Sequence, residues 1–172
     1  MEDAMIILTI EEIRKLFYFD FNTGKIYWAV DHGRWGNLPK NIEAGCLKNG
    51  YRWIRIGKKN YFGHHIAWAL WYGEWANSTL DHLNGIRDDN RPENLRIASV
   101  AENNQNQHNT PSHNTSGIRG VSWDAARNKW TARISLNGKS KNLGRFDSIE
   151  IAENAYLQAK MIHHPFSTGM QK

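Results

Sequence analysis

The chain has 172 residues, of which 40% are hydrophobic, and it contains eight tryptophans, so it has the composition of a folded protein and not of a disordered one. Its single cysteine, Cys46, excludes an internal disulfide framework and a zinc site with several thiolates, which favours a cytosolic protein. The net charge is +3 over residues 1–60, −3 over residues 61–108 and +5 over residues 109–172, a pattern that fits a polyanion-binding protein with a central cation site.

Residues 1–63 are predicted to form a small α+β region. A capping-box pattern at residues 9–12 precedes apolar residues at helical spacing, with Phe17 as the last of them. The Asn-Thr-Gly turn at residues 22–24 leads into a short strand at 25–28. Alternating apolar and basic residues predict a half-buried strand at 51–56. The apolar run at residues 5–8 is far too short to span a membrane, so no membrane partner is expected.

Residues 64–108 are predicted to form a helix followed by a strand–loop–strand–helix unit. The helix covers residues 64–72 and is stopped by Gly73. Strands are expected at residues 79–82 and 95–98, and a capping-box pattern at 99–102 opens the last helix.

This unit carries a polar set that fits phosphodiester hydrolysis: Asp81, His82, Asn94 and Asn103. A neutral His82 can act as general base near neutral pH. Asp81 and Asn103 offer hard oxygen ligands for one Mg²⁺ or Mn²⁺ ion. Asn94 can hydrogen-bond either the His82 ring or the backbone around it. Because adjacent strand residues point to opposite faces, a bend or strand end is needed to aim both Asp81 and His82 at one phosphate.

Residues 117–165 are predicted to form a separate module after a linker at 109–116 and before a short tail at 166–172. Strands are expected at residues 119–123, 129–136 and 139–146, with an Asn-Gly hairpin turn between the last two. A helix with small and aromatic residues on one face follows. Seven basic residues and one acid lie between Arg119 and Arg145, so the outer sheet face can bind DNA. On these residues alone, an outer face that is merely solvated is the slightly favoured alternative.

Residues 81–96 read DHLNGIRDDNRPENLR and resemble the HNH endonucleases, in particular phage and intron-encoded homing enzymes. The resemblance extends to the HHIAW run at residues 64–68 and the YGEW run at 72–75. It implies that His82 activates water, that Asn94 orients it, and that Asn103 binds the metal together with Asp81. Asparagine in place of the family's third histidine implies an oxygen-ligated metal. Weaker candidates are a metal ligand at His108 and supporting roles in the site for Asn90, Arg91 and His64.

The C-terminal residues resemble the Apetala-two/ethylene-response-factor DNA-binding domain, in the runs GIRGVSW, KWTARI and LGRF. The resemblance implies that this module contacts DNA. The predicted DNA-binding residues are Arg119, Arg133, Ser135, Lys139, Lys141, Asn142 and Arg145.

Together these patterns predict an α+β protein that is a monomer in solution, binds double-stranded DNA, acts in the bacterial host cytoplasm and is encoded by a phage. The expected activity is site-directed, homing-type DNA cleavage that yields 5′-phosphate and 3′-hydroxyl ends and needs no small-molecule cofactor. A non-catalytic DNA-binding regulator with an HNH scaffold and an RNA-directed nuclease are the alternatives.

Overall fold

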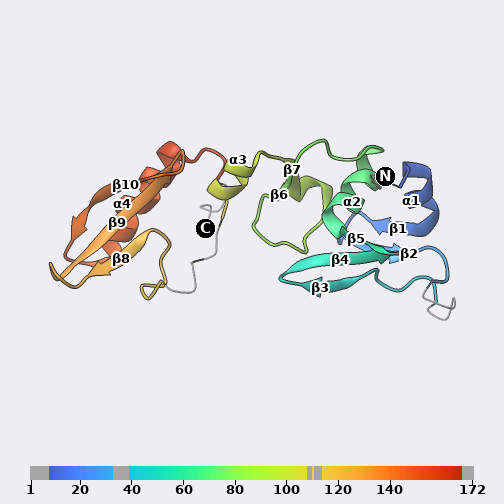
Figure 1. Ribbon diagram of the computed structural model, residues 1–172, viewed down its shortest axis with the longest axis horizontal. Coiled ribbons are helices and arrows are strands. Elements are labelled where there is room, and N and C mark those ends of the chain that lie inside the picture. Colours follow the sequence, from blue (N-terminus) through green and yellow to red (C-terminus); the bar gives the residue numbers. More distant parts are fainter. Residues whose placement is uncertain (1–7, 33–38, 108–109, 111–113, 168–172) are drawn as a thin grey trace, which may run out of the picture. The chain divides into compact units, whose positions relative to one another are not determined.

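The structure is a computed structural model that describes residues 8–32, 39–107, 110 and 114–167. The chain divides into two compact units, Met1–Ser99 and Val100–Lys172, which run from blue to green and from yellow to red in Figure 1. Each unit has its own hydrophobic core. Both units mix helices with antiparallel sheets, which confirms the predicted α+β class.

The first unit opens with α1 (Ile10–Leu16), which begins at the predicted capping box. The Thr9 side chain accepts a hydrogen bond from the Glu12 amide at 3.2 Å, and the Glu12 carboxylate accepts one from the Thr9 amide at 2.7 Å. Phe17, expected on the helix, instead starts β1 (Phe17–Asp20), because its extended backbone ends the helix there. β1 pairs with β2 (Lys25–Trp28).

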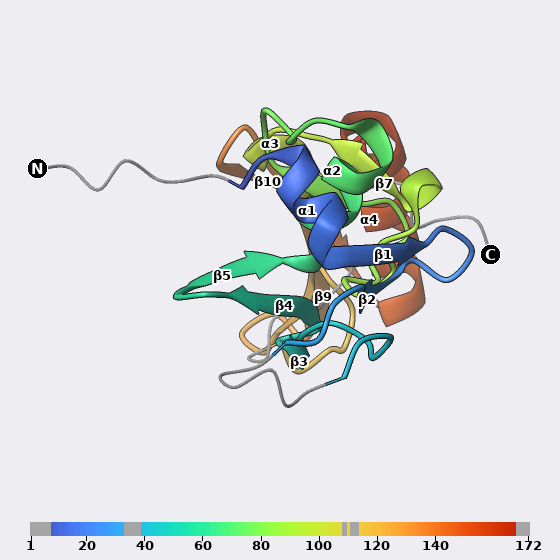
Figure 2. The ribbon, with the colours of Figure 1, turned by 90° about the vertical axis from the view of Figure 1, so that its right-hand side faces the viewer.

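A three-stranded antiparallel sheet follows, in the order β3 (Cys46–Lys48), β4 (Tyr51–Ile56) and β5 (Lys59–Phe62). Of these strands only β4 was predicted, since β3 and β5 are too short and polar to show a clear alternation. α2 (Gly63–Tyr72) then ends at Gly73, whose φ of 74° places it in the left-handed region that terminates helices. Figure 2 shows β4 and β5 as a hairpin below α1 and α2.

The predicted strand–loop–strand is present as β6 (Leu80–His82), the 3-10 helix η1 (Pro92–Asn94) and β7 (Leu95–Ile97). β6 and β7 form a two-stranded antiparallel sheet. They contribute Leu80 and Leu95 to the core of the first unit, which is otherwise built from residues of α1, α2 and the preceding strands. The short sheet therefore depends on the N-terminal elements for its apolar packing.

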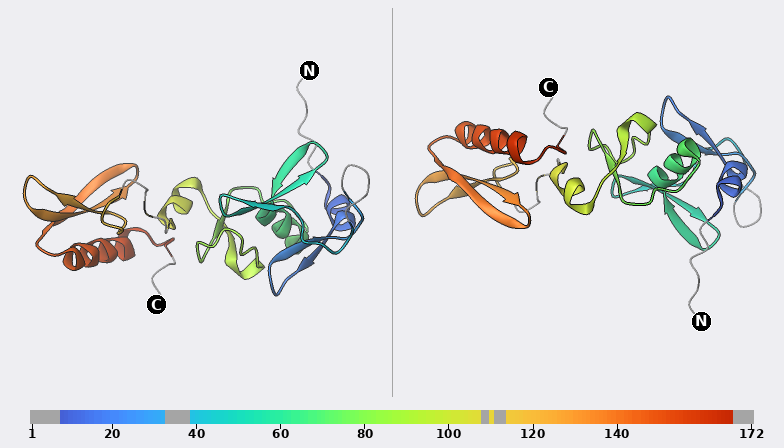
Figure 3. Two further views of the ribbon diagram at one scale, coloured as in Figure 1. Left: turned by 90° about the horizontal axis from the view of Figure 1, so that it is seen from below. Right: turned by 90° about the horizontal axis from the view of Figure 1, so that it is seen from above.

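The second unit starts with α3 (Val100–Gln105) and continues into a sheet with the strand order β10–β9–β8. Its strands are β8 (Val121–Asp124), β9 (Lys129–Leu136) and β10 (Lys139–Phe146). The turn residues Asn137 and Gly138 have φ of 49° and 76°, as the predicted Asn-Gly hairpin requires. α4 (Ile149–His163), capped by Ser148, lies along one face of this sheet (Figure 3).

The core of the second unit lies between this sheet and α4. Its buried residues are Val121, Ala132, Ile134, Ala152, Tyr156 and Ala159. The apolar face predicted for α4 is thus the face that packs on the sheet. Among the helices of the described residues, none is long and apolar enough to cross a lipid bilayer.

Candidate active site

The strand β6 positions Asp81 and His82 through its pairing with β7. In the antiparallel register Asp81 lies opposite Arg96, and His82 lies opposite Leu95. Both side chains are buried, with 6% and 5% of their surface exposed. β6 ends at His82, and the register places Asp81 and His82 on opposite faces of the two-stranded sheet. That both residues act on one phosphate stays a prediction.

His82 is surrounded by a carboxamide and aromatic rings. Its Nε2 atom lies 3.2 Å from Oδ1 of Asn90. The ring centroids of His64 and Tyr51 lie 5.1 and 6.1 Å from its own. Burial lowers the pKa of His82, although the Asn90 hydrogen bond and the Asp81 and Asp89 charges oppose that shift. The imidazole is therefore neutral near pH 7, which is the form that a general base needs.

Asp81 is engaged by an arginine on the neighbouring strand. Its Oδ2 accepts hydrogen bonds from Nε and Nη2 of Arg96 at 3.0 and 2.7 Å. Local sequence patterns do not distinguish Arg96 as a site residue. The signal that could have identified it is the register of two short strands, in which Asp81 and Arg96 are direct partners. Arg96 balances the buried carboxylate, whose isolated charge would be costly in this environment.

Asn94 holds together the loop between β6 and β7. Its Nδ2 donates to the Asp89 carbonyl at 2.7 Å, and its Oδ1 accepts from the Asn84 amide at 3.0 Å. The backbone continues the link, since the Leu83 amide donates to the Asn94 carbonyl at 2.8 Å. The predicted partners of Asn94 were the His82 ring and the backbone around it. In the structure Asn94 bonds the backbone that follows His82.

Asp89 is the second organising residue of this loop. Its carboxylate accepts hydrogen bonds from the Arg91 guanidinium at 2.7 and 2.6 Å and from the Asn84 side chain at 2.7 Å. The Arg91 contact lowers the pKa of Asp89 and raises that of Arg91. Arg91 thus shapes the loop that carries Asn90.

The loop is also fixed to the N-terminal elements of the first unit. Asp88 accepts two hydrogen bonds from Arg52 on β4, at 3.1 and 2.9 Å. The Arg87 guanidinium lies 4.8 Å from the Tyr51 ring centroid and donates to the Asn49 carbonyl at 3.0 Å.

The turn between β1 and β2 touches the same loop. A Cβ atom on Gly24 would lie 2.6 Å from the Arg91 amide nitrogen, so only glycine fits there. No local sequence pattern reveals these contacts, because their partners are far apart in the chain.

His64 lies at the start of α2 beside His82. It is buried, and burial lowers its pKa to about 2, with smaller contributions from His65 and His82. Its Nδ1 atom has no hydrogen-bond partner among the described residues. His64 is therefore a neutral ring that packs against His82 and Tyr51.

The two predicted metal ligands, Asp81 and Asn103, lie in different units of the chain. Asp81 lies on β6 in the first unit, and Asn103 lies on α3 in the second. Within the described residues, no group of three or more His, Cys, Asp or Glu side chains is placed to hold a metal. A carboxylate and a carboxamide oxygen fit a hard cation by their chemistry, so the pair stays a prediction. His108, the weaker candidate ligand, lies outside the described residues.

The predicted DNA-binding residues lie on the second unit. By the strand register, Arg133 and Ser135 of β9 and Asn142 and Arg145 of β10 face away from α4. Lys139 and Lys141 pair with Leu136 and Ile134 and so belong to the opposite face, where both are exposed.

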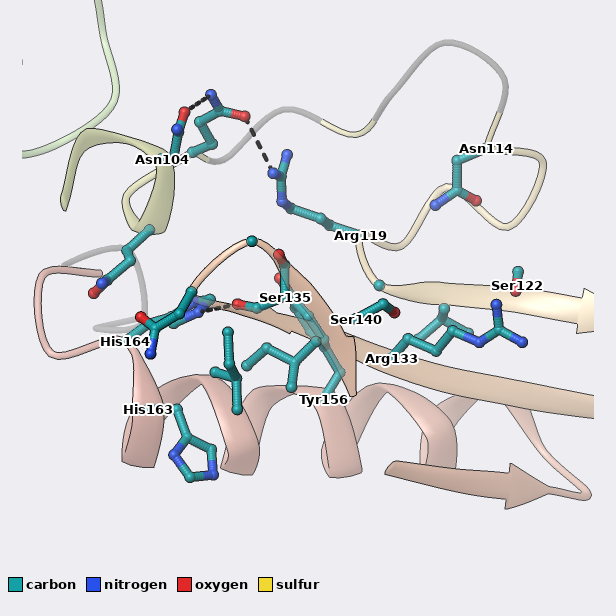
Figure 4. Close-up of a pocket in the computed structure, with 18 of the residues that line it drawn as sticks. Asn104, Asn114, Arg119, Ser122, Arg133, Ser135, Ser140, Tyr156, His163 and His164 are labelled. Carbon is teal, nitrogen blue, oxygen red and sulfur yellow. Dashed lines mark hydrogen bonds between the residues drawn. The ribbon is translucent and has the colours of Figure 1, made fainter. Parts of the chain in front are cut away.

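Arg119 borders a hollow of about 770 Å³ within this unit (Figure 4). Its Nη2 donates to Gln107 Oε1 at 3.1 Å, and Gln107 in turn donates to Asn104 Oδ1 at 2.9 Å. Arg133, Ser135 and Tyr156 line the same hollow. The DNA-binding roles of these side chains stay predictions.

Comparison with known proteins bears on the first unit and the start of the second. Residues 61–105 match the HNH endonuclease family. Protein 3.8 of Escherichia phage T7 is 33% identical over 88 residues, which are 51% of this chain and 72% of that protein. No solved structure gives a significant match. Because the family match ends at residue 105, the likeness of the C-terminal module to the Apetala-two/ethylene-response-factor domain stays a prediction.

Proposed function

Because the chain belongs to the HNH endonuclease family, we propose that it is a divalent-metal-dependent, site-directed DNA endonuclease of the homing type. The observation that carries the proposal is the surroundings of His82: a buried, neutral imidazole at a strand end, bonded to Asn90 through Nε2 and adjacent in sequence to the buried Asp81. The sequence similarity between this chain and protein 3.8 of Escherichia phage T7 supports a phage origin and hence action in the bacterial host.

The contact between Nε2 of His82 and Oδ1 of Asn90 orients the imidazole. The neutral ring takes a proton from a water molecule, whose oxygen attacks the phosphorus. The bond from phosphorus to the 3′-oxygen breaks, that oxygen takes a proton from solvent water, and His82 releases its proton to the solvent. The products are a 5′-phosphate and a 3′-hydroxyl end.

Asn94 acts in this scheme as a positioning residue. It bonds Asn84 and Asp89 on the two sides of the loop, so it keeps Asn90 in reach of His82. Asp81 and Asn103 are the residues that would hold one Mg²⁺ or Mn²⁺ ion. A divalent cation bound to them supplies stabilisation of the charge that develops on the phosphate and the departing oxygen.

The second unit supplies further grip on duplex DNA. Its outer sheet face presents Arg133, Ser135 and Asn142 in one antiparallel register, and such a face can contact phosphates and base edges. Arg145 is less available, because its Nε lies 3.3 Å from the Asp124 carboxylate.

Cleavage of supercoiled DNA that bears candidate sites, with Mg²⁺, with Mn²⁺ and with a chelator, tests the proposal. We expect His82→Ala to lower kcat by about 10²–10⁴-fold, because a general base is lost. His163→Ala, which removes an exposed histidine of α4, is the matched control and should cleave like the wild type.

Equal activity of wild type and His82→Ala on all substrates would contradict the catalytic assignment. Specific DNA binding without cleavage under any metal condition would favour the non-catalytic regulator instead.

A further inference from the structure

The three-stranded sheet β3–β4–β5 of the first unit has one face that takes no part in the proposed cleavage mechanism. In β3–β4–β5 the register places Trp53 opposite both Cys46 and Phe62, and Tyr51 opposite Lys48. Arg55 lies opposite Asn60 on the same face. The other face carries Ile54, Ile56 and Tyr61, which pack into the core. We call the first set the aromatic–basic face, with Lys48, Tyr51, Trp53, Arg55 and Phe62 as its main residues.

This face is positively charged. Residues 44–73 contain five basic side chains and no acidic one. Arg52 points to the core side and pairs with Glu43 and Asp88. Lys48, Arg55 and Lys58, the last in the β4–β5 turn, have no ion-pair partner among the described residues. Their charges are therefore available to an external polyanion.

The face also leads to His82 through a series of ring contacts. Trp53 and Phe62 have centroids 4.2 Å apart, and Phe62 and His64 have centroids 5.1 Å apart. His64 and Tyr51 both contact the His82 ring. All of these residues belong to the first unit, so a ligand on the face would lie next to the cutting residue.

Resting on the proposed endonuclease function, we propose that the aromatic–basic face of β3–β4–β5 binds the duplex DNA flank next to the scissile phosphate. Lys48, Arg55 and Lys58 contact phosphates, while the half-buried Tyr51 and Trp53 rings supply apolar contact beside them. Charge complementarity selects this ligand, because an acid-free cationic face repels basic partners and attracts the DNA backbone. The face would hold the flank in register with His82, separately from any contact made by the second unit.

Cys46 makes the proposal testable in the intact protein. It is the single cysteine of the chain, it is exposed, and it lies opposite Trp53 on the aromatic–basic face. The rate of Cys46 alkylation is measured on the full-length His82→Ala variant with and without a duplex of about thirty base pairs, a length sufficient for several phosphate contacts. That variant cannot cut by the proposed mechanism, so the result does not depend on whether the wild type cleaves DNA.

Bound duplex is expected to slow alkylation several-fold at low salt, and high salt should restore the rate. The triple variant Lys48→Gln/Arg55→Gln/Lys58→Gln should lose most of this protection. It should also reduce the slope of log Kd against log salt by about 2–3, since each lost phosphate contact removes roughly 0.9.

The matched control removes three exposed cations elsewhere in the first unit, as Arg14→Gln/Lys15→Gln/Lys40→Gln. It should retain the protection of Cys46 and change the slope much less. Unchanged alkylation of Cys46 in the presence of bound duplex would overturn the proposal. Equal effects of the two triple variants on protection and slope would overturn it as well. Failure of the endonuclease function would show itself separately, as absent cleavage by the wild type.

Discussion

The two three-stranded antiparallel sheets of the described residues have different surroundings. The inner face of β3–β4–β5 shares one core with α1, α2 and the strands that carry Asp81 and His82. The sheet β8–β9–β10 packs on α4 and has a core of its own. The first sheet thus shares its core with the strands of the candidate site, whereas the second sheet belongs to a module with a separate core. Damage to the first should disturb catalysis, and damage to the second should leave the surroundings of His82 intact.

The largest effect should come from core truncations in the two units. Ile13 and Ile134 are matched, since both are almost fully buried, one in each core. Either change to alanine should lower the free energy of unfolding of its unit by about 2–5 kcal/mol. Thermal unfolding followed together with cleavage is the measurement. Ile13→Ala should lower the temperature at which kcat is lost, whereas Ile134→Ala should act through DNA affinity and raise KM. Equal losses would show that the units are coupled.

Asn94→Ala is expected to have the next largest effect. It removes two hydrogen bonds across the loop and leaves the Asp89 carbonyl and the Asn84 amide without their side-chain partner. We expect kcat to fall by about 10–100-fold, because each buried group left unsatisfied costs about 1–3 kcal/mol. Asn154→Ala, which removes an exposed carboxamide of α4, is the control and should leave kcat unchanged. A loss confined to KM would argue against the positioning role of Asn94.

Asn90→Ala tests how His82 is oriented. The rate should fall about tenfold or more, because a misplaced base is less effective. A second readout separates orientation from general damage. The bond to Asn90 raises the pKa of His82, so its loss should move the acid limb of the kcat profile to lower pH. An unchanged limb with a reduced rate would indicate a structural role alone.

Lowering the pH should reduce the free energy of unfolding of the first unit more than that of the second. Burial lowers the pKa of His64, His65 and His82 in the folded first unit. In the unfolded chain the histidine pKa is about 6.5, so below that pH the unfolded chain binds more protons than the folded one. The free energy of unfolding that the neutral histidines contribute above this pH is therefore lost as the pH falls. The loss approaches about 1.4 kcal/mol per pH unit for each fully shifted histidine.

In the second unit burial shifts the pKa of Tyr156 and Lys160 instead, whose ordinary values lie near about 10. Urea midpoints at pH 7.5 and at a mildly acidic pH check the comparison. His64→Phe, which keeps a ring between Tyr51 and Phe62, should reduce the acid sensitivity of the first unit. Equal acid sensitivity of the two units would contradict this assignment.

Local sequence patterns predicted the elements that local chemistry determines. The capping box at Thr9, the Gly73 helix end and the Asn137-Gly138 turn are present because each depends on residues within one or two turns. β1 was not predicted because Phe17 continues the helical spacing of the residues before it, and β3 and β5 were not predicted because these short polar strands show no clear alternation.

In the candidate site, too, sequence patterns predicted some residues and not others. His82 and Asn94 could be selected by residue type and spacing, but their partners could not. Nothing in the sequence distinguishes the Asn90 contact to His82 from a role for Asn90 in shaping the loop. The Arg52–Asp88 pair joins residues 36 positions apart, and Arg96 becomes evident as the partner of Asp81 only once the strands are in register.

The single core of the first unit has a consequence for how this gene can recombine. Leu80 and Leu95 are the apolar side chains through which β6 and β7 enter a core made of earlier residues. A crossover that imported residues 79–97 alone would have to match a foreign apolar surface, the Arg52 contact and the Gly24 turn at once. A crossover after α3, where the family match also ends, cuts through neither core and keeps Asn103 with the first unit. Inheritance should therefore conserve the residues up to the end of α3 as one segment, while the sheet β8–β9–β10 and α4 can be replaced to redirect the protein to another target.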